Sequence, residues 1–225
     1  MKTKNMSLFY SNPMNKPGIL LTGKNAGDWY LQTLKRYSGN SAEACYIVQA
    51  DFEPINALLP YKMKEAAKLI EPYFRQLEKR NQAYILANIT LHEALNYFSF
   101  VPNYFISIKE ILKNISHKGG VIILGTQFTM NHSYIPSLLP QGLEQMPLSH
   151  ELQTAVDALR KKYYNTKDKV MAEQVFQSIK NIAADYVLIA CTELAVAYGD
   201  VDCSLNIINL PQLQIEQLLK QENDE

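Results

Sequence analysis

The chain has 225 residues and carries 22 basic and 22 acidic side chains, so its formal charge at neutral pH is zero. A balanced charge gives no overall field that would attract nucleic acid or an anionic membrane surface, and we expect neither as a partner. No apolar run approaches the ~18–20 residues that span a bilayer, and the run at 18–21 is too short and too late for a secretory signal.

Three cysteines, Cys45, Cys191 and Cys203, form neither a metal-ligand spacing nor an even set for disulfides. This usage is typical of a reducing compartment, and we expect the protein in the cytoplasm. The sequence has no Walker loop, GxGxxG or HExxH motif either, so it predicts no phosphate-binding loop, no metal and no cofactor.

Strands alternate with helices through the first half of the chain. Short apolar runs predict buried strands, and apolar residues at helical spacing predict amphipathic helices. We expect strands at 18–21, 44–49, 84–87 and 104–106, helices at 26–36, 61–80 and 91–97, and a further helix that ends at the glycine pair 119–120. Asp51 follows the second strand and is expected to cap the next helix.

The second half repeats this plan. We expect strands at 121–124, 186–190 and 205–208, helices at 152–164 and 169–184, and a partly helical stretch at 128–139 that Pro136 breaks. The closing helix begins near Leu210, with Pro211 in its first turn, where proline is tolerated. Residues 221–225 are expected to form a disordered tail.

The alternation predicts an α/β protein made of two similar, doubly wound lobes with a cleft between them. We expect an N-terminal extension at 1–17, a first lobe at 18–105 and a second lobe at 106–209. The helix and tail at 210–225 are expected to cross back to the first lobe.

Two segments of the first half are echoed in the second half. Gly-Ile-Leu-Leu-Thr-Gly at 18–23 is echoed by Val-Ile-Ile-Leu-Gly-Thr at 121–126, and Tyr-Ile-Leu-Ala-Asn-Ile-Thr at 84–90 by Tyr-Val-Leu-Ile-Ala-Cys-Thr at 186–192. Any two α/β halves share apolar strands and small turn residues, but the matching order and spacing favour duplication. Ligands bind at the carboxyl edge of such sheets, so we expect a cleft lined by residues near 22–25, 88–92, 126–130 and 191–193.

Cys191 lies at the end of a predicted strand, directly before a predicted helix. Exposed N–H groups at a helix N-terminus lower the pKa of a thiol, which makes Cys191 a candidate acid/base and the thiol expected to react fastest. A buried, inert cysteine is the alternative interpretation. Cys45 lies within a strand pattern and is expected in the core, whereas Cys203 lies in a polar loop.

Hydroxyl side chains gather just past the predicted strand ends. As a set, they suit a small carboxylate, although each one alone is typical of a helix cap. The set consists of Thr90, Thr126, Thr129 and Thr192. His92 and Glu93 follow Thr90 and are candidates for orienting a ligand or moving a proton, and a structural histidine is the alternative.

The densest basic stretch, Arg160-Lys161-Lys162, has two tyrosines beside it, as in some nucleic-acid-binding patches. Because Asp157 and Asp168 flank it, we interpret it as a solvated helix face.

Taken together, these motifs resemble the aspartate/glutamate racemase family. Gly-Thr-Gln-Phe-Thr-Met at 125–130, after Ile-Ile-Leu, is similar to the family's LGTxxTM segment, and Ala-Cys-Thr-Glu at 190–193 to its GCTE motif. Asn-Ile-Thr-Leu-His at 88–92 falls where the family carries CNTxH, the Asp-Phe pair at 51–52 matches an early DF pair, and 18–23 matches the opening glycine turn. The resemblance runs from about residue 18 to 218 and leans towards the aspartate-racemase branch.

The resemblance implies racemisation without pyridoxal phosphate, with one cysteine on each face of the α-carbon, and it also implies a homodimer. Cys191 would be the second cysteine, with Thr192 and Glu193 in the substrate site. The position of the first cysteine is Asn88, followed by Ile89, and neither side chain carries a proton. Uncharged amide side chains also stand where the family usually has Arg, Glu, Asp and His, and these are Gln127, Asn131, Asn209 and Gln214 in that order. The uncharged Gln127 argues against an acidic substrate.

Three functions fit this pattern. The first is a cofactor-independent racemase or isomerase acting next to a carboxylate, with Cys191 retained and the second proton supplied by His92 or by water held by Asn88 and Thr90. The second is a single-cysteine lyase, similar to the arylmalonate decarboxylases of the same superfamily. The third is a catalytically silent protein that binds a small amino acid or carboxylate or has a regulatory role.

Overall fold

The computed structural model describes residues 16–38, 45–80 and 82–220. Most of the predicted N-terminal extension and the predicted tail at 221–225 lie outside these residues.

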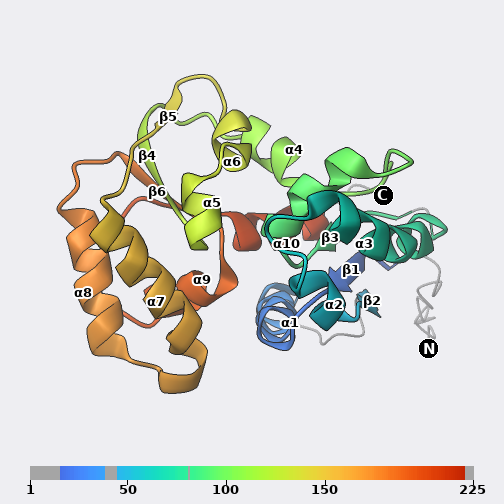
Figure 1. Cartoon of the computed structure of the whole chain (residues 1–225), viewed down its shortest axis with the longest axis horizontal. Helices are drawn as coiled ribbons and strands as arrows, with labels where there is room; N and C mark the ends of the chain where they lie inside the picture. Colours follow the sequence, from blue (N-terminus) through green and yellow to red (C-terminus); the bar gives the residue numbers. More distant parts are fainter. Residues whose placement is uncertain (1–15, 39–44, 81, 221–225) are drawn as a thin grey trace, which may run out of the picture.

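Two parallel sheets organise the chain. The first has the strand order β2-β1-β3, with β1 at Gly18–Leu21, β2 at Tyr46–Gln49 and β3 at Tyr84–Leu86. The second has the order β5-β4-β6-β7, with β4 at Gly119–Leu124, β5 at Leu143–Gln145, β6 at Tyr186–Ile189 and β7 at Ile207–Asn209. The predicted α/β fold of two similar lobes is therefore confirmed (Figure 1).

Helices flank both sheets. In the first lobe they are α1 (Lys24–Ser38), α2 (Phe52–Asn56), α3 (Met63–Glu78) and the 3-10 helix η2 (Thr90–Tyr97), followed by α4 (Ile108–Lys113). In the second lobe they are α5 (Gln127–Asn131), α6 (Tyr134–Ser137), α7 (His150–Thr166), α8 (Lys169–Lys180) and α9 (Thr192–Gly199), and α10 (Leu210–Lys220) closes the chain.

The structure corrects several predicted elements. Residues 104–106 form one isolated bridge, between Phe105 and Tyr84, instead of a strand. The carbonyl of Tyr104 and the N–H of Ile106 both bond to the backbone of Tyr84, so the pairing extends no further. Pro136 lies inside α6 instead of ending a helix. The helix before the glycine pair already ends at Lys113, and α8 ends at Lys180. Asp51 occupies the N-cap of α2, but its side chain makes no cap hydrogen bond.

The strand register identifies which residues of the two lobes are counterparts. Beyond the last paired residues, the Ala87 N–H bonds the carbonyl of Leu20 at 2.9 Å, and the Ala190 N–H bonds that of Leu124 at 2.8 Å. The next residue is Asn88 in the first lobe and Cys191 in the second lobe, so these two residues are structural counterparts. The sequence echo pairs Ile89 with Cys191 and is off by one position at this edge. The same register makes Thr22 the counterpart of Thr126.

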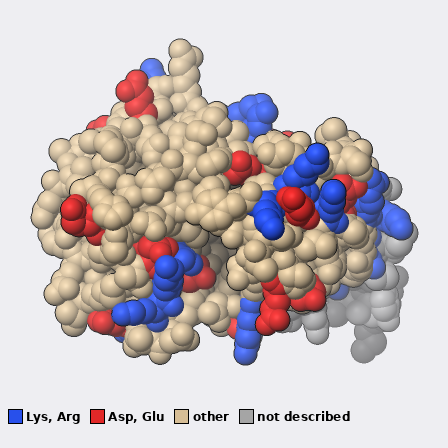
Figure 2. All heavy atoms as spheres, viewed as in Figure 1, with Lys and Arg blue, Asp and Glu red and all other residues tan. Residues whose placement is uncertain are grey.

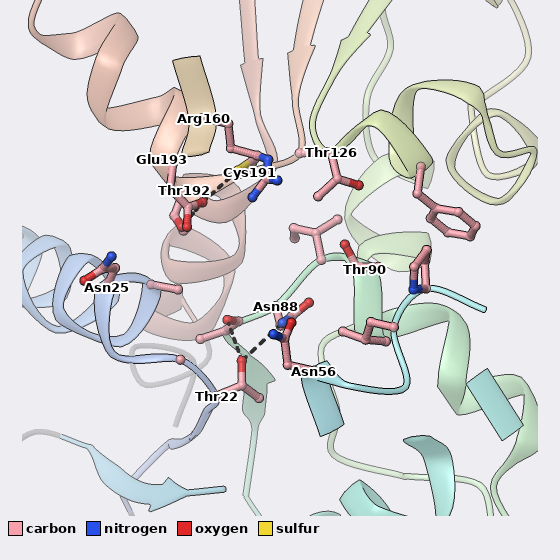
Figure 3. A pocket seen from close by; sticks show the side chains of 18 of the residues that line it. Thr22, Asn25, Asn56, Asn88, Thr90, Thr126, Arg160, Cys191, Thr192 and Glu193 are labelled. Carbon is pink, nitrogen blue, oxygen red and sulfur yellow. Dashed lines mark hydrogen bonds between the residues drawn. The ribbon is translucent and has the colours of Figure 1, made fainter. Parts of the chain in front are cut away.

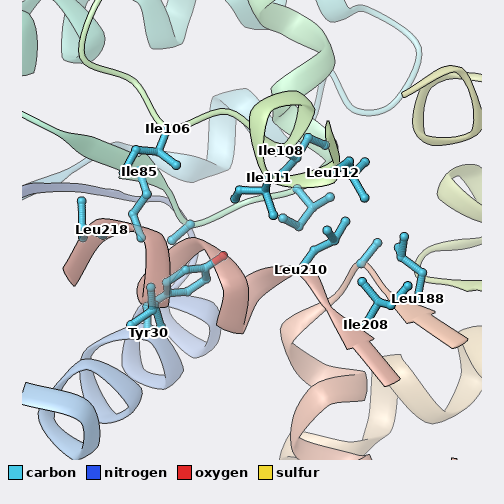
Figure 4. Close-up of a cluster of buried hydrophobic side chains, with 14 of the residues drawn as sticks. Tyr30, Ile85, Ile106, Ile108, Ile111, Leu112, Leu188, Ile208, Leu210 and Leu218 are labelled. Carbon is cyan, nitrogen blue, oxygen red and sulfur yellow. The ribbon is translucent and has the colours of Figure 1, made fainter. Parts of the chain in front are cut away.

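One apolar core joins the two lobes. The helix α10 follows β7 of the second sheet, yet it packs against α1, α4 and β3 as well as β6. Its side chains Leu210, Ile215 and Leu218 are fully buried in this shared cluster (Figure 4). Burying one such side chain contributes about 1.5–3 kcal/mol, so this helix fixes the lobes relative to each other and holds the cleft between them.

Candidate active site

A cavity of about 580 Å³ lies where the carboxyl edges of the two sheets meet. The segments that follow β1, β3, β4 and β6 all line it, with further side chains from α1, α2, the loop before α3, and α7. In the space-filling view it is a groove between the two halves of the molecule, with acidic and basic side chains on the wall formed by the second lobe (Figure 2). The volume is typical of small-molecule sites, which measure roughly 300–1,000 Å³.

Cys191 projects into this cavity from the N-cap of α9. Its Sγ donates a hydrogen bond to Oε2 of Glu193 at 2.7 Å, and the Thr192 hydroxyl donates to the same oxygen at 3.1 Å. The side chain is 8% exposed, so the thiol faces the cavity from a mostly buried position (Figure 3). The thiol and the carboxylate form one hydrogen-bonded pair.

The environment of Cys191 raises the pKa of its thiol, opposite to the prediction from its place before a helix. Burial is the largest cause, and the charge and hydrogen bond of Glu193 add to it. Arg160 and the backbone N–H of Leu194 lower the pKa, but by less. The resting thiol is therefore protonated near neutral pH and is positioned as an acid.

Arg160 brings a positive charge to the same cavity. Its Nε and Nη2 donate to Oδ1 of Asp157 at 3.0 and 2.9 Å, while Lys161 Nζ lies 2.7 Å from Oδ2. Burial alone would raise the pKa of Asp157, but the hydrogen bonds from Lys161 and Arg160 hold it below the usual value. The prediction of a solvated helix face is therefore wrong for Arg160, which points into the cavity (Figure 3), whereas Lys161 and Lys162 are exposed as expected.

Asn88 lies across the cavity from Cys191, on the turn after β3 (Figure 3). Its amide donates to the Thr22 hydroxyl at 3.3 Å, and its carbonyl oxygen accepts the N–H of Leu91 at 3.1 Å. Local hydrogen bonds thus hold both ends of this amide, which has no group that titrates.

The structure brings three of the four predicted threonines to the cavity. Thr90, Thr126 and Thr192 line it, whereas Thr129 does not. The Thr129 hydroxyl lies 2.9 Å from that of Thr126, whose oxygen caps α5 by accepting the Thr129 N–H. Thr129 therefore supports the turn that presents Thr126.

His92 does not line the cavity, contrary to its expected place beside the substrate. Its Nδ1 accepts the Ile108 N–H at 3.3 Å, and its Nε2 lies 3.1 Å from the amide nitrogen of Gln214. Burial lowers the pKa of His92 to about 3. The ring is a neutral, buried part of the core, and the neighbouring Glu93 pairs with His132 at 3.5 Å, also outside the cavity.

The other two cysteines are both buried, Cys45 just before β2 in the shared core and Cys203 in the core of the second lobe. Cys203 does lie in the loop after α9, but it is packed instead of exposed.

The sequence did not single out several lining residues. Asn56, Tyr61 and Arg160 come from the short helix α2, the loop before α3 and the second half of α7, whose directions only the fold determines. The run around Arg160 was a visible signal, and its proximity to Asp157 on one helix turn indicated an ion pair.

Comparisons with known proteins show where this architecture recurs. No family model and no curated protein matches the chain. Among solved structures, an aspartate racemase homologue from Pyrococcus horikoshii has a TM-score of 0.69 at 19% identity, covering 93% of this chain and 99% of its own. The aspartate racemase of Picrophilus torridus has a TM-score of 0.70 at 19% identity, covering 93% and 95%.

A glutamate racemase from Francisella tularensis, solved in complex with D-glutamate, has a TM-score of 0.54 at 15% identity, covering 95% of this chain and 83% of its own. Within the described part of the chain, no helix has both the length and the apolar character needed to cross a membrane. The structural comparisons show that the two lobes and their parallel sheets have the fold of the aspartate and glutamate racemases.

Proposed function

We propose that the protein is a cofactor-independent enzyme of the racemase or isomerase type, which moves a proton at the carbon next to a carboxylate. The observation that carries this proposal is the Cys191–Glu193 pair, a buried thiol bonded to a carboxylate at 2.7 Å inside the cavity. Such a pair can hold or release one proton at a fixed point.

The charges around the pair support a carboxylate substrate. The Arg160 guanidinium is on the same side of the cavity as Cys191, and the hydroxyl of Thr126 also lines the cavity (Figure 3). A substrate carboxylate held there would place its α-carbon next to the thiol. Arg160 would also stabilise the negative charge that develops on that carboxylate when the α-proton leaves.

The proton then follows a balanced path. The thiol proton moves to Glu193, and the thiolate takes the α-proton, leaving its electron pair on the carbon and the adjacent carboxylate. The reverse step returns a proton from Cys191 to the same face. Inversion needs a second donor opposite, and we propose a water held by Asn88 and Thr90 for this role, because His92 does not line the cavity.

A single-cysteine lyase is the second candidate, and it is favoured because Asn88 has no group that can carry a proton. Residue 88 is the structural counterpart of Cys191, and its amide is held by Thr22 and Leu91. A decarboxylation leaves a carbanion that needs one proton from one face. The protonated resting thiol of Cys191 suits that single step.

Proton NMR in deuterium oxide, followed by chiral analysis, tests these proposals on a panel of amino acids and substituted malonic acids. Loss of the α-proton signal with inversion identifies an isomerase, and release of carbon dioxide identifies a lyase. Cys191→Ala should abolish either activity, and Cys203→Ala is the matched control. Binding without either reaction would show that the cavity is catalytically silent.

A further inference from the structure

We propose that the cavity takes a carboxylic acid whose other substituent is apolar and about the size of an aromatic ring. In this arrangement Arg160 holds the carboxylate, and Tyr61, Phe128 and Phe52 contact the substituent. This inference rests on the proposed function in one respect, since it assigns the substrate class to the same cavity.

Among the described residues, five charged side chains line the cavity. They come from the start of α1 and from α7 and α9, and they are Lys24, Asp157, Arg160, Lys161 and Glu193. Asp157 holds Arg160 and Lys161, and Glu193 is bonded to Cys191. Arg160, the proposed carboxylate anchor, lies beside the thiol of Cys191 (Figure 3).

The rest of the lining is apolar or uncharged, and it comes from both lobes. From α2, the loop before α3, the turn after β3, and α5, the apolar side chains are Phe52, Leu59, Pro60, Tyr61, Ile89 and Phe128. The Tyr61 and Phe128 rings meet edge to face, with their centroids 6.2 Å apart, across the boundary between the lobes. The ring of Phe52 packs on Gly23 at the end of β1.

Tyr61 is the most exposed apolar side chain of this wall, whereas Phe52 and Phe128 are partly buried. Tyr61 is 88% exposed, more than any other large hydrophobic residue in the described part of the chain. Large apolar side chains left open at a cavity indicate a binding surface, because covering them removes apolar area from water. An aromatic ring packed against Tyr61 and Phe128 would cover part of this area.

The same wall disfavours a second carboxylate. The lining residues from α2, the loop before α3, and α5 include the amides Asn56 and Gln127 but no cation. A carboxylate placed against Tyr61 and Phe128 would find no cation on this wall, whereas an apolar ring placed there would remove apolar area from water. Acids with an apolar substituent should therefore bind more tightly than aspartate.

Calorimetric titration with phenylalanine, mandelate, alanine and aspartate tests the proposal. We expect the two aromatic acids to bind at least about tenfold more tightly than alanine and aspartate. Tyr61→Ser and Phe128→Ala should weaken the aromatic acids by about tenfold and leave alanine unchanged. Tyr97→Ser, at another exposed tyrosine, is the matched control, and Arg160→Gln should weaken every acid.

Equal or tighter binding of aspartate would overturn the inference, as would a Tyr61→Ser effect no larger than that of Tyr97→Ser or an absence of binding by all four acids. Exchange of the α-proton of aspartate or alanine, without preference for the aromatic acids, would leave the proposed function standing and the inference wrong. Selective binding of the aromatic acids without exchange or decarboxylation would support the inference and contradict the proposed function.

Discussion

The thiol of Cys191 illustrates how a side chain two positions away can outweigh a helix N-terminus. Position predicted a lowered pKa, because backbone N–H groups at the start of α9 favour a thiolate. Burial and the carboxylate of Glu193 act in the opposite direction and are the larger causes. The sequence predicted that Cys191 would lie at the cleft. It did not predict the protonation state of the thiol, because the sequence pattern does not show that the Glu193 side chain turns back to contact Cys191.

Glu193→Gln is predicted to lower the pKa of Cys191, because it removes the negative charge and the ionic acceptor that hold the proton on sulfur. The midpoint of the pH dependence of alkylation at Cys191, followed by mass spectrometry, should move to lower pH. Glu173→Gln, on the exposed part of α8, is the control and should leave the midpoint in place. A midpoint that stays fixed in Glu193→Gln would mean that burial alone sets the pKa.

His92 is predicted to make the fold less stable in mild acid. Its pKa is lowered from 6.5 to about 3 in the folded protein, so the unfolded chain binds more protons between these values. Stability should therefore fall as pH drops below 6.5, by about 2 kcal/mol between about pH 7 and about pH 5.

Urea unfolding at several pH values measures this loss. His92→Gln keeps a polar group that can form hydrogen bonds but removes the titration, so the stability of this variant, although lower at neutral pH, should depend less on pH. A slope as steep as that of the native protein would assign the effect to other groups.

At the scale of elements, α10 connects the lobes through two tyrosines of α1. Buried Tyr30 donates to Oε1 of Gln214 at 2.5 Å, and exposed Tyr37 donates to Oε1 of Glu216 at 3.3 Å. The two bonds join the same two helices and differ in exposure, in length and in acceptor, which is an amide oxygen for Tyr30 and a carboxylate for Tyr37. They allow a buried and an exposed hydrogen bond between the same helices to be compared.

Tyr30→Phe is predicted to lower the free energy of unfolding by about 1–3 kcal/mol, because it leaves the amide oxygen of Gln214 without its donor inside the core. Tyr37→Phe should change it by less than about 0.5 kcal/mol, since water replaces the exposed partner. Urea denaturation of both variants provides the comparison. Equal losses would show that the burial of the Tyr30 bond has no energetic consequence.

Element length decided how much of the fold could be predicted. The long amphipathic helix at Met63–Glu78 buries Met63, Ile70 and Phe74 at helical spacing, so its pattern was visible in the sequence. The five-residue α2 and the strand Leu143–Gln145 are too short to show a period, and two of the three residues in that strand are exposed. Neither was predicted, although α2 contributes Phe52 and Asn56 to the cavity.

At the scale of the molecule, duplication predicted that four strand ends would meet at one cavity, and the structure brings them together there. The sequence echo did not determine which residues face each other, since hydrogen bonding between strands sets that register. The backbone bonds of Ala87 and Ala190 make Asn88 the counterpart of Cys191. The two related lobes therefore place the amide of Asn88 on one side of the cavity and the thiol of Cys191 on the other.

Asn88→Cys is predicted to restore a proton carrier on the face opposite Cys191. If the protein moves an α-proton, this variant should raise inversion relative to exchange at least about tenfold, because a positioned acid/base group typically contributes 10²–10⁴-fold. Chiral chromatography and proton NMR in deuterium oxide measure the two rates. Asn88→Ala is the matched control, because it also removes the bonds from the Asn88 amide to Thr22 and from the Leu91 N–H to Asn88 without adding a thiol or a hydroxyl. Each variant should lose about 1 kcal/mol of stability with the bond to the Leu91 N–H. Equal inversion in the two variants would show that residue 88 does not face the α-carbon, and the duplicated architecture would then carry one-sided chemistry from Cys191 alone.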